Sequence, residues 1–209
     1  MRIGICGGTF DPFHHGHLEP VLAARDVMQW DRAFYVPAHL QPFKRDQATS
    51  SGYHRFAMTV LGTEERDELY VSPRELERGD VSYTVDTLEQ LRADDPDATL
   101  DWIIGDDNLP QLEQWKSLSR IFELANFVVL SRTGGAAASL VPASHRHRVT
   151  TPDERGRSGA IVFARNATVP ISSTEVRRRV RAGQPIDAFV DPRVRRYIEH
   201  NRLYQGEHP

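Results

Sequence analysis

The first seventeen residues hold the feature that most constrains the fold: a short apolar run, then two glycines, then the start of a helix. Residues 2–6 have the length and composition of a buried strand. Gly7 and Gly8 follow directly, so the backbone can turn sharply there and approach a ligand without interference from a Cβ. Beyond Gly16 apolar residues recur at helical spacing. Because proline is tolerated only in the first turn of a helix, Pro20 predicts a helix that begins near residue 16 or 17.

Two histidines, His14 and His17, flank this expected helix start. A helix N-terminus offers free N–H groups and about half a positive charge, which suits a phosphate. Imidazoles three residues apart can face the same side of the helix entry. Taken singly, these parts are common, because two glycines after a strand occur in many α/β proteins and most surface histidines have no special role. Neither of the two familiar phosphate loops is present here.

The whole string of residues 7–17, Gly-Gly-Thr-Phe-Asp-Pro-Phe-His-His-Gly-His, is far more specific. It resembles the nucleotidylyltransferase superfamily, whose phosphate-binding signature is Thr/His-x-Gly-His, here residues 14–17. The resemblance implies that Thr9 contacts both substrates and that His14 and His17 act on the reacting phosphate. The ATP-binding residues that it implies in this loop are Gly7, Gly8, Thr9, Phe10, His14 and His17.

A second stretch, residues 170–177, begins a helix with a basic side. Ser172 and Glu175 have the spacing of a capping box, and the helical pattern ends near Gly183. Alone, this would be an ordinary capped helix. Beside the first motif, it resembles the superfamily's second signature, Ile-Ser-x-Thr-x-x-Arg. The matching residues, implied to bind ATP phosphates, are Ile171, Ser172, Thr174 and Arg177, with Arg177 also catalytic.

Two further segments resemble the nicotinate-nucleotide adenylyltransferases. Residues 82–88 match their Ser-Tyr-Thr-x-x-Thr-Leu segment, and residues 103–107 match Ile-Ile-Gly-x-Asp. The resemblance implies that amides near Tyr83 and Thr84 receive a nicotinate carboxylate and that Trp115 stacks on the pyridine ring. It also implies that Gly105 and Asp107 bind ATP, with Asp107 on ribose hydroxyls. Without the resemblance, Tyr83 and Trp115 would be packing residues and Asp107 a helix cap.

The loop Gln-Pro-Phe-Lys at residues 41–44 resembles a Pro-Pro-His-Lys loop that reaches the nucleotide phosphates. Lys44 is therefore expected to bind ATP, although a solvated loop lysine is an equal alternative. Phe43 stands where the family has histidine, so any nucleotide contact that the family makes through this position is left open.

Strands and helices alternate along the chain. Strands are expected at residues 2–6, 33–36, 69–71, 100–104 and 127–130. Helices are expected from residue 16 or 17 to 30, at 54–61, at 82–94 and at 172–183, together with a short helix that ends at residue 124. This alternation predicts an α/β fold with a doubly wound, mostly parallel sheet, Rossmann-like, with ligands bound beyond the carboxyl ends of the strands. Residues 134–159 lack a period and are interpreted as a mobile surface excursion. One domain, residues 1–209, is expected, with a C-terminal helical part at about 171–204 completing the nucleotide site.

Composition sets the outer bounds. The 209 residues, 39% of them hydrophobic, can bury one core, and the net charge of −3 gives no reason to expect nucleic acid or an anionic membrane as partner. The single cysteine, Cys6, excludes a disulfide framework within the chain. No apolar run approaches the roughly 20 residues of a membrane span, and no signal peptide is evident, so a cytoplasmic enzyme is expected.

The resemblance implies adenylyl transfer from ATP to nicotinate mononucleotide, yielding nicotinate adenine dinucleotide and pyrophosphate, with Mg²⁺ carried on the ATP. A sister transferase acting on nicotinamide mononucleotide or phosphopantetheine is the nearest alternative, and a non-catalytic nucleotide-binding module is another. DNA binding through the basic side at residues 177–181 is a weak third reading. Oligomeric state, the role of residues 134–160 and the choice between acid and amide acceptor stay open at this stage.

Overall fold

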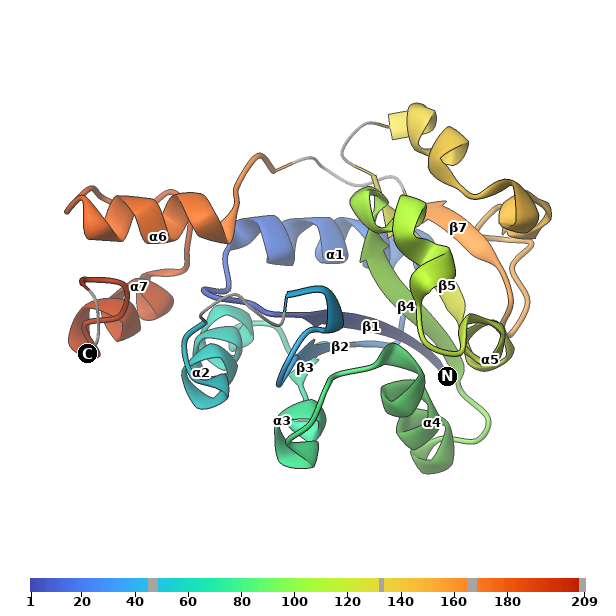
Figure 1. Ribbon diagram of the computed structural model, residues 1–209, viewed down its shortest axis with the longest axis horizontal. Helices are drawn as coiled ribbons and strands as arrows, with labels where there is room; N and C mark the ends of the chain where they lie inside the picture. The colour runs from blue at the N-terminus through green and yellow to red at the C-terminus, as the bar shows by residue number, and fades with distance from the viewer. Residues whose placement is uncertain (45–48, 132–133, 165–168, 207–209) are drawn as a thin grey trace.

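A parallel β-sheet organises the structure, a computed structural model that describes residues 1–44, 49–131, 134–164 and 169–206 (Figure 1). Within these ranges the sheet has seven strands in the order β3-β2-β1-β4-β5-β7-β6, all pairs parallel. The strands are β1 Arg2–Gly8, β2 Arg32–Pro37, β3 Leu69–Val71, β4 Thr99–Gly105, β5 Asn126–Leu130, β6 Val149–Thr150 and β7 Ile161–Ala164. The predicted α/β class with a doubly wound parallel sheet is confirmed.

Helices cover both faces of this sheet (Figure 1). They are α1 His15–Met28, α2 Gly52–Thr63, α3 Arg74–Arg78, α4 Thr84–Asp94, α5 Leu118–Leu124, α6 Ser173–Arg181 and α7 Pro192–His200. Short 3₁₀ segments lie at Pro42–Lys44, Asp106–Gln114, Gly134–Leu140 and Ala143–Arg148. No helix of the described ranges has the length and apolar character that crossing a bilayer would require.

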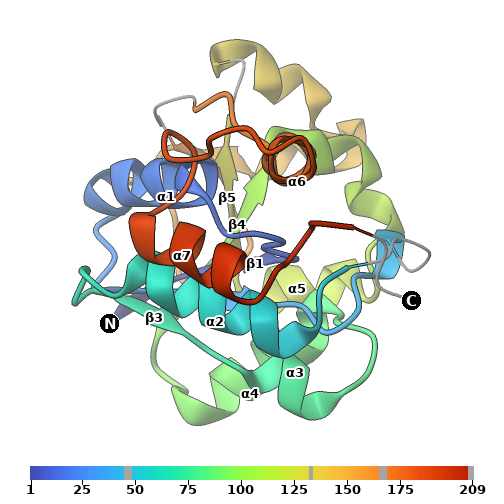
Figure 2. The same cartoon turned by 90° about the vertical axis from the view of Figure 1, so that its left-hand side faces the viewer.

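Three groups of buried apolar side chains hold the layers together. One group joins α4 and α5 to the sheet, for example through Leu88 and Ile121. A second joins α1 to the opposite face, with Val21 and Met28 among its members. The third joins α2 to the C-terminal part, where Met58 packs among residues of α6 and α7 such as Val176. Figure 2 shows α7 beside α2, so the C-terminal part closes one end of the molecule.

The first loop departs from expectation in two ways. Gly7 and Gly8 stay within β1, and the chain turns only afterwards, at Phe10, whose φ is 51°. Helix α1 begins at His15, slightly earlier than predicted, and Pro20 lies inside it. At this start the His15 N–H donates to the Phe189 carbonyl at 2.9 Å, which gives one of the free N–H groups of the first turn a partner.

The described side chains of residues 137–159 are mostly exposed, in line with the expected surface excursion, but a few buried residues anchor the segment to the fold. The segment contributes the edge strand β6, and it buries Ala137, Val141 and the long side chain of Arg155. Arg155 donates to Asp101 on β4 at 3.2 Å, which anchors the segment to the middle of the sheet. Strand β7 and helix α3 were not predicted either. The strand order places β1 and β4 side by side at the sheet centre, where such folds open a crevice for ligands.

Candidate active site

A cavity of about 650 Å³ opens over the carboxyl ends of β1 and β4. Its wall comes from the loop after β1, the start of α1, the segment before α4, the segment after β4 and the start of α6. The following predicted residues all line it: Gly7, Gly8, Thr9, Phe10, His14, His17, Tyr83, Thr84, Gly105, Asp107, Trp115, Ile171, Ser172, Thr174 and Arg177. The side chain of Lys44 lies outside the described residues.

The two glycines of β1 are required by packing as well as by the cavity. A Cβ on Gly7 would stand 2.7 Å from the Trp102 ring, and one on Gly8 would stand 2.7 Å from the Phe10 ring. Phe10 is buried and holds its left-handed backbone conformation under contacts with Phe13 and Tyr35. A backbone conformation this unusual for phenylalanine is kept only when neighbours fix it.

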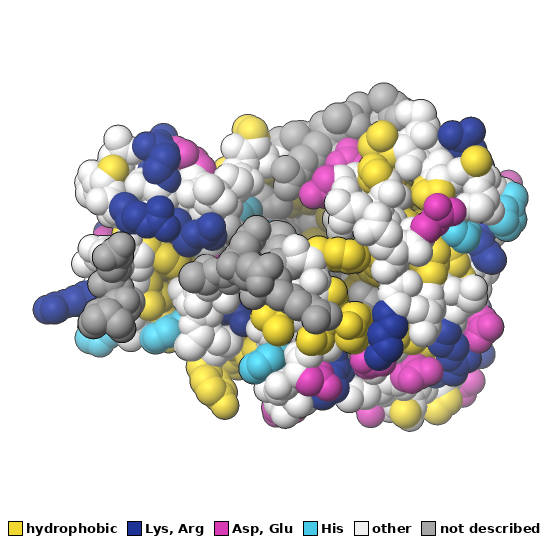
Figure 3. All heavy atoms as spheres, in the orientation of Figure 1, with side chains coloured by type: hydrophobic (Ala, Val, Ile, Leu, Met, Phe, Trp, Pro, Cys, Tyr) yellow, Lys and Arg dark blue, Asp and Glu magenta, His cyan; other side chains and the backbone are white. Residues whose placement is uncertain are grey.

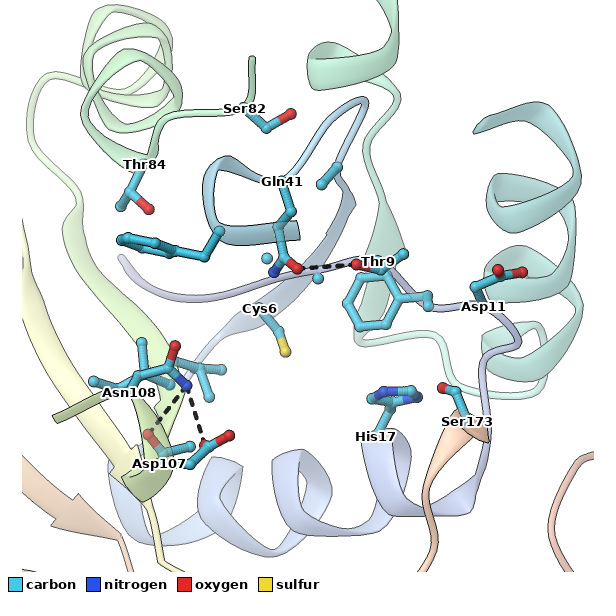
Figure 4. A pocket seen from close by; sticks show the side chains of 18 of the residues that line it. Cys6, Thr9, Asp11, His17, Gln41, Ser82, Thr84, Asp107, Asn108 and Ser173 are labelled. Atoms are coloured by element: carbon cyan, nitrogen blue, oxygen red, sulfur yellow. Dashed lines mark hydrogen bonds between the residues drawn. The ribbon is translucent and has the colours of Figure 1, made fainter. Parts of the chain in front are cut away.

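His14 and His17 stack against each other at the start of α1. Their ring centroids are 3.7 Å apart, with an interplanar angle of 20°. The His14 backbone N–H donates to Nδ1 of His17 at 3.3 Å. Because Nδ1 accepts this bond, a neutral His17 carries its proton on Nε2 and can donate it to a ligand. Figure 4 shows His17 directed into the pocket, on the same side as Thr9 and Ser173.

The start of α6 is joined to the loop after β1. The Ser173 hydroxyl donates to the Pro12 carbonyl at 3.1 Å. The Arg177 guanidinium donates to the Asp11 carbonyl at 2.6 Å and to the Thr174 hydroxyl at 3.4 Å. These bonds hold the two predicted phosphate-binding segments, far apart in the sequence, in one wall of the cavity. Lys and Arg side chains gather over this helix (Figure 3).

Half of the predicted capping box is present. The Ser172 hydroxyl accepts from the Glu175 N–H at 3.2 Å, as expected. The Glu175 carboxylate instead forms ion pairs with Arg178 and Arg179 at 2.8 Å each. These arginines lower the pKa of Glu175 to about 2. The Glu175 carboxylate therefore pairs with the arginines one turn along the helix and not with the backbone N–H of Ser172, which a full capping box would require.

The opposite wall carries the residues predicted for the acceptor. Tyr83 precedes α4 and Thr84 is its first residue, so the first amides of this helix border the cavity. Trp115 lies half-buried, its ring edge-on to Phe127 at 5.6 Å. Lys116, which the sequence reasoning did not single out, places its ammonium 4.4 Å from the Tyr83 ring centroid and 3.1 Å from the Asp86 carboxylate.

The segment after β4 supplies the third side of the cavity. Asp107 is exposed there, and its carboxylate accepts from the Asn108 side chain at 3.1 Å (Figure 4). A Cβ on Gly105 would collide with Oδ1 of Asp107, so the present orientation of this carboxylate depends on the absence of a side chain at residue 105. The arrangement presents a carboxylate and an amide side by side, which suits the hydroxyls of a ribose.

Further lining residues were missed by the sequence reasoning. Gln41 accepts from the Thr9 hydroxyl at 3.1 Å (Figure 4). Glu75 of α3 is buried, accepts from the Thr87 hydroxyl at 2.6 Å, and has its pKa raised mainly by burial. The Cys6 thiol points into the cavity, and burial raises its pKa to about 12. Gln41 lies within the loop of residues 41–44 and Cys6 directly precedes the first motif, whereas Glu75 is far from any recognisable motif.

The described residues contain no group of three or more His, Cys, Asp or Glu side chains that could hold a metal ion. The cavity offers imidazole, guanidinium, hydroxyl and helix-terminal N–H donors instead. These donors fit a ligand that carries negative charge on phosphate groups.

Comparison with known proteins agrees with this geometry. A sequence model of the cytidylyltransferase-like family matches residues 5–179. A protein of Pseudoalteromonas atlantica named "Probable nicotinate-nucleotide adenylyltransferase" is 36% identical over 208 residues, 97% of this chain and 94% of the relative. A protein of the same name from Streptomyces coelicolor is 37% identical over 201 residues, 96% of this chain and all of the relative.

A similar fold is also found among solved structures. The nicotinic acid mononucleotide adenylyltransferase of Plasmodium falciparum, complexed with NaAD, aligns with a TM-score of 0.70 over 99% of this chain and 98% of that chain. The identity between the two sequences is 17%, so the likeness concerns the fold.

Proposed function

The chain belongs to the nicotinate-nucleotide adenylyltransferases, within the cytidylyltransferase-like family, and from this membership we propose that it transfers the adenylyl group of ATP to nicotinate mononucleotide. The products are nicotinate adenine dinucleotide and pyrophosphate, a step of NAD biosynthesis. The proposal includes a cytoplasmic location. The observation that best supports the proposed activity is that both phosphate signatures line the same cavity as Tyr83 and Trp115.

The phosphate side of the cavity binds ATP in this proposal. Thr9 and the amides after β1 hold the reacting phosphates, and His14 and His17 donate to oxygens of the α-phosphate. The start of α6, with Ser172, Thr174 and Arg177, holds the β- and γ-phosphates, and Lys44 assists from the neighbouring loop. Arg177 suits this role because its planar fork meets phosphate oxygens bidentately and stays charged. The backbone at Gly105 and the Asp107 carboxylate receive the adenosine ribose.

The opposite wall binds the acceptor. The amides of Tyr83 and Thr84 at the start of α4 receive the nicotinate carboxylate, as helix N-termini favour anions. The Trp115 indole stacks on the pyridine ring, since a flat apolar face matches a flat ring.

The reaction needs no protein nucleophile. An oxygen of the mononucleotide 5′-phosphate attacks the α-phosphorus of ATP, and the bond from that phosphorus to the oxygen bridging to the β-phosphate breaks. Pyrophosphate leaves with the electron pair. Catalysis therefore consists of positioning the two phosphates in line and of stabilising the charge that develops between them. Mg²⁺, carried by the nucleotide, neutralises part of the phosphate charge.

The test is pyrophosphate release from MgATP with the nicotinate and nicotinamide mononucleotides in parallel, comparing kcat/KM. A strong preference for the acid form supports the proposal and the carboxylate contact at Thr84. Equal rates would refute the acceptor specificity while leaving the transferase chemistry. Turnover only with phosphopantetheine, run as a third arm, would replace the proposed acceptor altogether.

A further inference from the structure

Arg55 of α2 is fully enclosed although it is charged. It is 2% exposed, and its guanidinium donates to the carbonyls of Thr9 at 2.8 Å, Ser50 at 3.0 Å and His39 at 3.3 Å. Burial lowers its pKa, and the charge of Asp11 opposes that effect. A buried guanidinium with carbonyl partners on two separate loops fixes those loops relative to each other.

Asp11, in the loop after β1, is the anion beside this cation. It is 3% exposed, and its Oδ2 accepts from the Ser50 N–H at 3.1 Å. Its Oδ1 accepts from the Tyr204 hydroxyl at 2.5 Å. Its backbone carbonyl accepts from Arg177 at 2.6 Å. The same residue thus connects the phosphate-binding loop, the C-terminal turn and the arginine proposed to bind the leaving group.

The turn that carries Tyr204 is held in an unusual backbone conformation. Arg202 and Tyr204 have φ values of 51° and 64°, a region that residues other than glycine seldom adopt. Between them, Leu203 is buried in the third apolar group, beside α2. Packing therefore fixes the turn so that the hydroxyl of Tyr204 reaches a carboxylate 193 residues earlier in the chain. Such conformations persist where the surrounding structure holds them, and they occur often at functional sites.

We propose that Tyr204 is a positioning residue for the adenylyl transfer: its hydroxyl fixes Asp11, and Asp11 sets both the loop that carries Thr9 and His14 and the orientation of Arg177. The inference rests on the proposed function, because it assumes that this loop holds the reacting phosphates. Small displacements of groups that align reactants reduce turnover much more than they reduce binding.

The chain provides a matched control. Tyr197 of α7 also joins the C-terminal part to α2 through its hydroxyl, which lies 2.9 Å from Nδ1 of His54. Among the described residues, this hydroxyl forms no hydrogen bond to the loop after β1. Tyr204→Phe and Tyr197→Phe therefore each remove one hydroxyl from the same packing unit. We expect Tyr204→Phe to lower kcat about ten- to hundredfold with KM for both substrates within about twofold. Tyr197→Phe should keep kcat within about twofold of the wild-type value, while changing Tm about as much as Tyr204→Phe does.

A second readout does not depend on turnover. Hydrogen exchange of the amides at residues 9–14 should accelerate in Tyr204→Phe and stay unchanged in Tyr197→Phe. Asp11→Asn should accelerate the same amides, and the double variant with Tyr204→Phe should add little to either single change.

The outcomes separate the two hypotheses. Unchanged exchange at residues 9–14 in Tyr204→Phe overturns the inference, whatever the activity. If the wild-type enzyme turns over and Tyr204→Phe has the same kcat, the proposed positioning role of Tyr204 is also overturned. A wild-type protein without turnover on any acceptor, with accelerated exchange in Tyr204→Phe, refutes the proposed function and leaves the hydroxyl as the residue that fixes the loop.

Discussion

The pair of stacked imidazoles at the start of α1 is the group on which the proposed chemistry depends most directly. Replacing His17 by alanine removes a donor that the fold holds in place through His14 and Phe13. Loss of one preorganised donor to developing charge costs about 10²–10³ in rate. We therefore expect His17→Ala to lower kcat by about that factor with little change in Tm, measured by pyrophosphate release and thermal unfolding.

His15 provides the matched control for this variant. It is the histidine next to the pair, in the same helix turn, and it does not line the cavity. His15→Ala should retain activity within about twofold, as expected of a substitution outside the site. Equal losses in both variants would show that the effect comes from the helix start and not from an imidazole in the cavity.

Lys116 gives a prediction about acceptor choice. Its ammonium lies between the Tyr83 ring and the Asp86 carboxylate, beside the amides proposed to bind the nicotinate carboxylate. Lys116→Met removes a positive charge and leaves Asp86 uncompensated, so kcat/KM for the acid acceptor should fall about three- to tenfold. The effect is modest because the lysine side chain is 45% exposed and water screens its charge. The amide acceptor, whose ring carries a neutral carboxamide in place of the carboxylate, should be nearly unaffected.

Asp86→Asn is the opposing variant. It removes the negative charge instead, so the preference for the acid acceptor should rise or stay constant. A preference that falls in both variants would mean that the ion pair acts by shaping α4, and the electrostatic explanation would be wrong.

Residues within short motifs could be predicted because their spacing and chemistry are local. The strings around His14 and Ser172 each contain enough of a signature to indicate a phosphate site, and both strings line the cavity. Glu75 could not be found in this way, because only the tertiary fold brings it to the cavity, whereas Gln41 and Lys116 stand next to predicted residues but match no signature themselves. The contact of Gly7 with the Trp102 ring likewise depends on pairing between β1 and β4.

At the scale of elements, most of the longer segments and the short strand β3 were predicted, whereas β6, β7 and α3 were not. Strand β6 has two residues and β7 has four, too few to show a period. Residues 134–159 gave no pattern because their main anchor is a buried cation. Charged side chains are normally found at the surface, and Arg155 is buried because the Asp101 carboxylate and the backbone carbonyls of Met28 and Pro152 accept its hydrogen bonds.

Arg155 therefore stabilises the segment that sequence reasoning assigned to the surface. The Arg155 and Asp101 side chains are 2% and 0% exposed, and Asp101 also accepts from the Trp30 indole at 2.7 Å. Arg155→Met leaves a buried carboxylate without its cation, so the free energy of unfolding should fall by about 3 kcal/mol or more. Urea unfolding of the variant and the wild type measures this difference.

Arg157, two positions along, is the control for this ion pair. Its side chain is 52% exposed and pairs with the fully exposed Asp97 at 3.8 Å. Arg157→Met should change the free energy of unfolding by less than about 1 kcal/mol. Similar losses in the two variants would contradict the assignment of Arg155 as the anchor.

At the scale of the whole molecule, the sequence predicted the α/β class from alternation alone, but it did not predict the third apolar group. That group joins Met58 of α2 to Ile198 of α7 and places the C-terminal part against the first half of the chain. Apolar periodicity shows which face of a helix is buried and does not show which partner buries it. The shared group predicts that the C-terminal part unfolds together with the sheet.

The distribution of tryptophan makes this testable. The three tryptophans, Trp30, Trp102 and Trp115, all lie in the sheet part, so their fluorescence reports its unfolding, whereas far-ultraviolet circular dichroism also reports α6 and α7. Ile198→Ala creates a cavity in the shared group and should cost about 2–5 kcal/mol. If the molecule is one cooperative unit, both signals coincide in the wild type and shift equally in the variant. A shift confined to circular dichroism would show that the C-terminal part unfolds separately, and the single-domain prediction would then be wrong.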